Sequence, residues 1–459
     1  MTNFKPFLLR LYHIMKDSLT KVNYPKKSLF LILFIVAFIR LYAQPTFETL
    51  PSSLMLQIGE LEHVIDVEQQ SNNSFIITFE QPLDHDNVAG VSFTQRIYLT
   101  HVGFDQPMVM VTEGYAAPRN RLYEISNLLT ANQLIVEHRY FGVSTPKTKD
   151  WQHLTTRQAA TDHHRIIESF KKLYTEKWLT TGISKGGQTA IYHRYYYPDD
   201  VDVTVPYVAP LNFEVEDPRL TKFLNSVGSA SCRKKIFEYQ RRLLERREAL
   251  LPLMKWYCLG KEQKFTIGRE AAFEYAVLEY PFSFWQWGKD CRDIPTATAS
   301  NDEMLQHLID VVGFNLYSDR GVAYYHPFFY QAMTELGYYG FDTTGLRHLL
   351  KAVPQPSNAI FAPMSNLAFD AKLNQDVRKW LRKSGNKMLY IYGELDAWSG
   401  AAVNPSGKTD ALKIVMKNRA HHDARIKNMT SADKQKTIET LNRWLADESP
   451  KAKKVLSNE

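Results

Sequence analysis

Short apolar runs alternate with amphipathic stretches along much of this chain. The runs are rich in β-branched and aromatic residues and are bounded by turn residues, which predicts strands. These are Asn73–Glu80, Val91–Val102, Met108–Thr112, Gln133–Glu137, Trp178–Thr181, Val201–Val208, Lys387–Tyr392 and Leu412–Met416. Helical spacing predicts helices over Thr156–Lys177, from near Gln188, and over Gln435–Ala446. Such alternation is typical of a mostly parallel sheet covered on both faces.

The alternation stops between residues 217 and 369. This segment is charged, aromatic-rich and helical in its spacing, and Arg233–Met254 is predicted to form one long helix. Strand-like runs return after it. We therefore expect an α/β catalytic domain over residues 44–216 and 370–459, with residues 217–369 inserted as a helical cap.

A glycine-rich turn lies between one predicted strand and the helix that follows it. Its sequence is Gly182-Ile183-Ser184-Lys185-Gly186-Gly187. A serine flanked by glycines at a strand-to-helix turn is typical of the nucleophile elbow of α/β-hydrolases. The motif is short, so its meaning depends on whether an acid and a base follow in the required order.

Two later loops supply that acid and base. Asp396 follows one late predicted strand, with Glu394 as the alternative acid, and His421 and His422 follow the next strand. In this arrangement Ser184 is the nucleophile, a histidine takes its proton, and Asp396 holds the imidazole in the required tautomer. The ordered set predicts a serine hydrolase with an α/β-hydrolase fold, a mostly parallel sheet and an inserted helical cap.

Two backbone amides are expected to form the oxyanion hole. One is the amide of Lys185, directly after the nucleophile, and the other is that of Tyr115 in the loop after an early strand. Losing one such donor costs about 3 kcal/mol of transition-state stabilisation. This mechanism requires no cofactor.

The cysteines allow two interpretations. Cys232, Cys258 and Cys291 form no CxxC pair, so they do not predict a metal site. In an exported protein they allow one disulfide with one thiol left over. Three buried thiols are the alternative, and the sequence leaves both open.

Composition and the N-terminus narrow the class of protein. Hydrophobic residues make up 44% and charged residues 23%, and the net charge of +7 is scattered, so we exclude nucleic acid as a partner. Lys26 and Lys27 precede the apolar run Ser28–Ile39, and the small residue Ala43 follows it. This pattern predicts a signal peptide or N-terminal extension over residues 1–43. We expect an exported protein, periplasmic or extracellular, with no membrane partner beyond an N-terminal anchor.

Several motifs resemble those of one peptidase family. They are Gln81–His85, Val111–Tyr115, Glu137–Gly142, Ser184–Gly187, Tyr280–Trp287 and Asp396–Gly400. The sequence resembles the PS-10 (S37) family of secreted bacterial serine peptidases, which are tripeptidyl aminopeptidases. It is also similar to the S28 group of prolyl carboxypeptidases and dipeptidyl peptidases. Lys185 after the serine favours the tripeptidyl group.

The resemblance implies an enzyme that cuts peptides near their N-termini, often after proline. Ser184 and Asp396 carry over directly. The family's motif favours His422 as the base, whereas the S28 relatives favour His421. We prefer His422, although Asn418-Arg419-Ala420 replaces the family's usual glycine-rich lead-in to the histidine.

An exopeptidase also needs groups that hold the substrate's end. A carboxylate facing the free α-amine would form a charge-assisted hydrogen bond, and Glu113 and Glu335 are the candidates. Trp398, two residues after the acid, is expected to form a wall for the residue before the cut bond, where an aromatic surface suits proline. Structural roles are the alternative for all three.

We therefore predict an exported serine exopeptidase that releases N-terminal tripeptides through an acyl-enzyme. Its catalytic residues would be Ser184, Asp396 and His422, with His421 as the alternative, and its partners peptides with a free N-terminus. An esterase or lipase on the same fold, or a non-catalytic surface binding protein, are the alternatives.

Overall fold

Nine strands form one mixed sheet in the order β1-β2-β3-β5-β4-β6-β7-β8-β9. The strands are β1 (Val64–Ser71), β2 (Ser74–Pro82), β3 (Ser92–Thr100), β4 (Met108–Thr112), β5 (Asn132–Val136), β6 (Trp178–Ile183), β7 (Val203–Tyr207), β8 (Met388–Gly393) and β9 (Ala411–Met416). Antiparallel pairing joins β1 to β2, β2 to β3 and β3 to β5. The other neighbours, from β5 through β4, β6, β7 and β8 to β9, pair in parallel. Every strand predicted from the sequence is present, and β1 was missed.

The computed structural model describes residues 53–446. The predicted signal segment, residues 1–43, lies outside them. Among residues 53–446, none of the helices combines the length and the apolar character that a membrane span requires.

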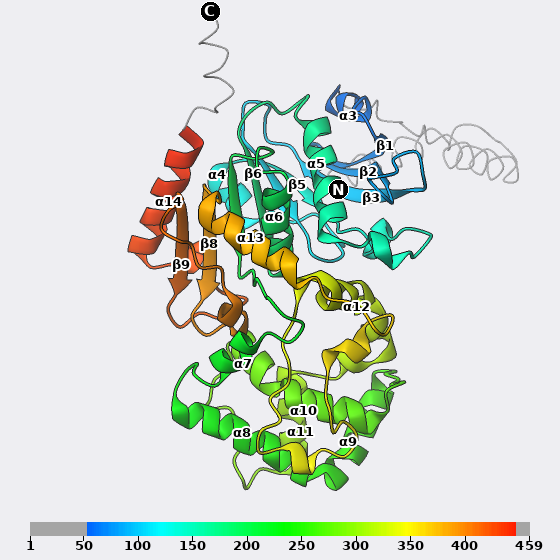
Figure 1. Cartoon of the computed structure of the whole chain (residues 1–459), viewed down its shortest axis with the longest axis vertical. Helices are drawn as coiled ribbons and strands as arrows, with labels where there is room; N and C mark the ends of the chain where they lie inside the picture. The colour runs from blue at the N-terminus through cyan, green and yellow to red at the C-terminus, as the bar shows by residue number, and fades with distance from the viewer. Residues whose placement is uncertain (1–52, 447–459) are drawn as a thin grey trace, which may run out of the picture. The chain divides into compact units, whose positions relative to one another are not determined.

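Helices cover both faces of the sheet (Figure 1). The helices of the α/β part are α3 (Ser53–Gly59), α4 (Glu124–Leu129), α5 (Thr156–Phe170), α6 (Lys185–Tyr196), α13 (Ala371–Lys383) and α14 (Ser431–Ala446). Side chains alternate along β4: Val109 belongs to the same hydrophobic cluster as Trp444 of α14 on one face, and Met110 to the same cluster as Ile166 of α5 on the other. The parallel strands are therefore buried on both faces, as predicted.

The chain changes direction within the sheet at β4. This strand lies between β5 and β6, so the connection after β4 leads one way along the sheet and the connection after β5 leads back past it. Ligand sites in such sheets lie beyond the carboxyl ends of the strands where the order reverses. Gly114 follows β4 and Ser184 follows β6, so both stand at this point.

Six cap helices come between β7 and β8 in chain order. They lie beyond the end of the sheet toward which the arrow of β9 points in Figure 1. They are α7 (Pro218–Leu224), α8 (Ala230–Glu245), α9 (Arg247–Gly260), α10 (Arg269–Gln286), α11 (Asn301–Val311) and α12 (Asp319–Gln331). The single helix predicted over Arg233–Met254 is wrong, because the chain turns at Arg246. This turn brings Arg247 into the core, where its guanidinium pairs with Glu274.

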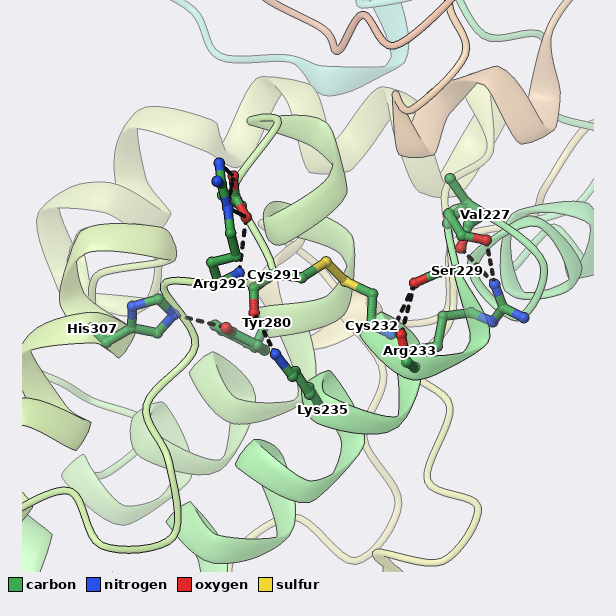
Figure 2. Close-up of a disulfide and its surroundings, with 12 residues drawn as sticks. Val227, Ser229, Cys232, Arg233, Lys235, Tyr280, Cys291, Arg292 and His307 are labelled. Carbon is green, nitrogen blue, oxygen red and sulfur yellow. Dashed lines mark hydrogen bonds and ion pairs between the residues drawn. A yellow bond between two sulfur atoms is a disulfide. The ribbon is translucent and has the colours of Figure 1, made fainter.

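One disulfide joins two parts of the cap. Cys232 in α8 is bonded to Cys291, which follows α10 (Figure 2), and Cys258 is a buried free thiol. The Cα atoms of the bonded pair are 5.5 Å apart. Of the two interpretations of the cysteines, one disulfide with one thiol left over is confirmed.

Candidate active site

Ser184 occupies a sharp turn between β6 and α6. Its backbone has φ 58° and ψ −123°, and its amide donates to the Tyr207 carbonyl at 2.9 Å. A Cβ on Gly182 would lie 2.3 Å from the backbone of Gly186, and a Cβ on Gly186 would lie 2.4 Å from the Thr112 oxygen. Only glycine fits at both positions, which explains the motif. Together with the strand order of the sheet, this elbow shows that the chain has an α/β-hydrolase fold, as predicted.

The acid and the base meet below the cap. His421 Nδ1 lies 2.8 Å from Asp396 Oδ2, and both side chains are buried. The other carboxylate oxygen of Asp396 accepts from the Trp398 amide at 3.1 Å. The preference for His422 is therefore corrected, because His421 pairs with the acid and His422 is exposed.

The loop before the histidines explains this outcome. Asn418 has φ 55°, and the Ala420 amide donates to Asp423 Oδ1 at 2.6 Å, which turns the chain so that the first histidine faces inward. Glu394, the alternative acid, is exposed and accepts from the Asn418 amide at 2.9 Å. It thus supports the loop, whereas Asp396 contacts the imidazole.

A cap residue also holds the base. The His421 amide donates to the carbonyl of Gln286, the last residue of α10, at 3.0 Å. The ring of Trp287, the next residue, lies edge-on to the imidazole at 6.1 Å between centroids. The histidine loop and the end of α10 therefore form one unit.

The Lys185 side chain links the two loops expected to form the oxyanion hole. Its Nζ donates to the Gly114 carbonyl at 2.7 Å and lies 5.6 Å from the centroid of the Tyr115 ring. Burial lowers the pKa of Lys185 well below its usual range. Because C=O and N–H point in opposite directions in a trans peptide, holding the Gly114 oxygen also fixes the direction of the Tyr115 N–H. The Lys185 amide is the first of α6, so it has no acceptor within the helix.

A cavity of about 310 Å³ lies between this turn and the cap. Ser184, Lys185 and Tyr115 line it on the sheet side. Its aromatic lining consists of Tyr115, Trp287, Tyr325, Phe328, Phe329, Tyr338, Tyr339 and Trp398. The structure thus places Trp398 in the wall of the cavity that Ser184 enters. Flat apolar side chains around a small space suit a ring such as that of proline.

The two carboxylates expected to bind the substrate lie elsewhere. Glu335 accepts from the Thr156 amide at the start of α5 at 2.6 Å, and Glu113 accepts from the hydroxyl of Tyr123 and, at 3.3 Å, from Arg121. Burial raises the pKa of Glu335 to about 7 and also raises that of Glu113. Neither residue lines the cavity that holds Ser184, so the expectation that they bind the substrate's amine is corrected.

Glu279 also lines the cavity, and it is not among the site residues predicted from the sequence. Its carboxylate accepts from the hydroxyls of Ser283 at 2.8 Å and Tyr339 at 2.6 Å. Burial raises its pKa to about 7. Its sequence signal is an acid within a long, otherwise mostly apolar stretch that it shares with Glu274, since the residues of α10 from Ala271 to Tyr280 are all buried.

The family model described as PS-10 peptidase S37 matches residues 53–457. The chain belongs to this family. Prolyl tri/tetrapeptidyl aminopeptidase of Streptomyces mobaraensis is 33% identical over 401 residues, which cover 85% of this chain and 84% of that protein. Lysosomal Pro-X carboxypeptidase of Bos taurus is 23% identical over 71% of this chain and 77% of its own length.

A solved structure, that of proline iminopeptidase from Mycobacterium smegmatis, also aligns with the chain. The TM-score is 0.43 at 12% identity, and the alignment covers 80% of this chain and 98% of the other. Membership of the PS-10 peptidase S37 family agrees with the resemblance that the sequence motifs gave. This membership makes the chain a serine peptidase.

Proposed function

We propose that this protein is an exported serine aminopeptidase that releases N-terminal tripeptides, with a preference for proline before the cut bond. The observation that carries the proposal is the buried Asp396–His421 pair beside an aromatic cavity that Ser184 enters. The name of the Streptomyces relative supports both the release of short N-terminal peptides and the preference for proline.

The proposed mechanism follows from these groups. His421 accepts the proton of the Ser184 hydroxyl as the oxygen attacks the scissile carbonyl, and Asp396 stabilises the imidazolium that forms. The amides of Lys185 and Tyr115 donate to the oxygen that becomes negatively charged. His421 then protonates the leaving amine. Water next attacks the acyl-enzyme in place of the amine, and His421 accepts the proton of the water and returns it to the Ser184 oxygen as the acid product leaves.

Two features support the proposal of export. The sequence begins with a pattern typical of a signal peptide, and a disulfide joins Cys232 to Cys291. Disulfides persist in the periplasm and outside the cell, whereas the cytosol keeps thiols reduced. Fractionation of cells that produce the full chain, followed by N-terminal sequencing of the mature protein, tests both the compartment and the cleavage point.

The activity is tested with Ala-Ala-Pro-p-nitroanilide and longer peptides that begin with the same tripeptide. We expect release of p-nitroaniline and of the tripeptide, and their loss in Ser184→Ala. A protein that hydrolyses short acyl esters but no peptide would refute the peptidase proposal. Equal cleavage of N-acetylated peptides would refute the exopeptidase part.

A further inference from the structure

Glu279 is a buried acid in the wall of the proposed active site, and among residues 53–446 it has no positively charged partner. The groups of the described chain that lower its pKa are the hydroxyls of Ser283 and Tyr339, and no cation is among them. A buried carboxylate that lacks a cation loses several kcal/mol of solvation. A cation that enters the cavity would restore much of this loss.

A second buried acid of the same helix shows the difference. Glu274 accepts from the Arg247 guanidinium and from the amides of Lys351, Ala352 and Val353. Both carboxylate oxygens of Glu274 thus accept hydrogen bonds from groups of the cap, and its charge is paired with Arg247. Glu279 has hydroxyl donors only, and it faces the cavity rather than the cap core.

We propose that the Glu279 carboxylate binds the free α-ammonium group of the peptide substrate. The Ser283 and Tyr339 hydroxyls orient the carboxylate, and the ammonium donates to it. This inference rests on the proposed aminopeptidase function and names the group that makes the enzyme an exopeptidase. An N-acetylated peptide has a neutral amide in place of the α-ammonium group, so the Glu279 carboxylate would remain without a cation when it binds.

The position of Glu279 along α10 relates to the length of the released fragment. The carbonyl of Gln286, at the end of this helix, holds the His421 amide, so that end of α10 lies at the catalytic base. The rise of the helix from Gln286 back to Glu279 is about 10 Å. An extended tripeptide spans about 10 Å and a dipeptide about 7 Å. The rise of the helix between these two residues is thus comparable with the length of a tripeptide.

Glu279→Gln tests the inference because it removes the charge and keeps the shape. The substrates are Ala-Ala-Pro-p-nitroanilide with a free and with an acetylated N-terminus. Glu335→Gln is the matched control, since it removes another buried carboxylate that lies outside the cavity. Rates are normalised to the sites that react with a fluorophosphonate, which measures folded enzyme with a reactive Ser184.

We expect Glu279→Gln to lower kcat/KM for the free-amine substrate about 10- to 100-fold, the value of a hydrogen bond to a charged group. The rate on the acetylated substrate should stay within about 3-fold of the wild-type rate. Glu335→Gln should keep the wild-type preference for the free amine. In the wild type, mass spectrometry of products from longer peptides should show three-residue fragments.

The following results would overturn the inference. Glu279→Gln could slow both substrates equally or neither, or Glu335→Gln could abolish the preference instead. If the wild type reacts with the fluorophosphonate but cleaves neither peptide, the proposed function fails and this inference fails with it. If the wild type prefers the free amine and Glu279→Gln keeps that preference, the inference fails alone.

Discussion

Removing the charge of Glu279 should stabilise the folded protein at neutral and alkaline pH. Burial raises the pKa of this carboxyl from 4.5 to about 7. The surrounding titratable groups from the packed elements are Tyr317, Tyr338 and Tyr339, whose pKa values are all raised, so they stay uncharged over this range. Ionisation of Glu279 in the folded chain is therefore opposed by burial and not offset by a cation.

The sign and size of the effect follow from proton linkage. Below pH 4.5 the carboxyl is protonated in both the folded and the unfolded chain, so it does not lower the free energy of unfolding. Between pH 4.5 and about 7 the unfolded chain releases the proton and the folded chain retains it, so the free energy of unfolding falls as pH rises. Above pH 7 the free energy of unfolding has fallen by its full amount, about 3 kcal/mol. Glu279→Gln cannot ionise, so it avoids this loss.

Urea unfolding at several pH values between 4 and 8, with the disulfide intact, measures the effect. The free energy of unfolding of Glu279→Gln, minus that of the wild type, should rise by about 3 kcal/mol across this range. Glu439→Gln, an exposed substitution on α14, is the control for general effects of pH. A difference that does not change with pH, or that falls as pH rises, would refute the reasoning and indicate a cation beside Glu279.

Three further predictions concern other parts of the site. His421→Ala should lower kcat at least about 10⁴-fold, whereas His422→Ala should stay within about 3-fold in the same peptide assay; the reverse result would restore the second histidine as the base. Lys185→Met should lower kcat about 10- to 100-fold with a smaller change in KM, since it frees the loop that carries the Tyr115 amide, and an unchanged kcat would exclude this role. Cys232→Ser should lower the free energy of unfolding by about 4 kcal/mol, because the disulfide closes a loop of 59 residues, and denaturant unfolding with and without reductant measures the loss.

The sequence predicted the parallel sheet well because each central strand is buried on both faces. Such strands read as continuous apolar runs between turn residues, as at β4 and β8. β1 was missed for the opposite reason. It lies at the edge of the sheet, and of its residues only Val67 is buried, so its sequence carries little apolar pattern.

The order of the elbow, acid and base was also available from the sequence, but the choice of histidine was not. His421 and His422 are adjacent, so spacing cannot separate them. The choice depends on the positive φ of Asn418 and on the bond from the Ala420 amide to Asp423, which are properties of the folded loop. The acid in the cavity was missed for a related reason, since whether a buried glutamate meets a cation depends on contacts distant in sequence.

The cap contributes to the chemistry as well as to the shape of the cavity. Helix α10 supplies the carbonyl that holds His421 and the carboxylate of Glu279, and Trp287, directly after the helix, lies beside the imidazole. Movement of this helix would therefore change the position of the base and of the proposed amine site together. Cys291 follows α10 by a few residues and ties this segment to α8, so the disulfide restrains the same unit. If Glu279 binds the substrate amine as proposed, one helix sets both substrate length and the position of the base, and a chain lacking the cap should lose the support of His421 as well as the preference for a free amine.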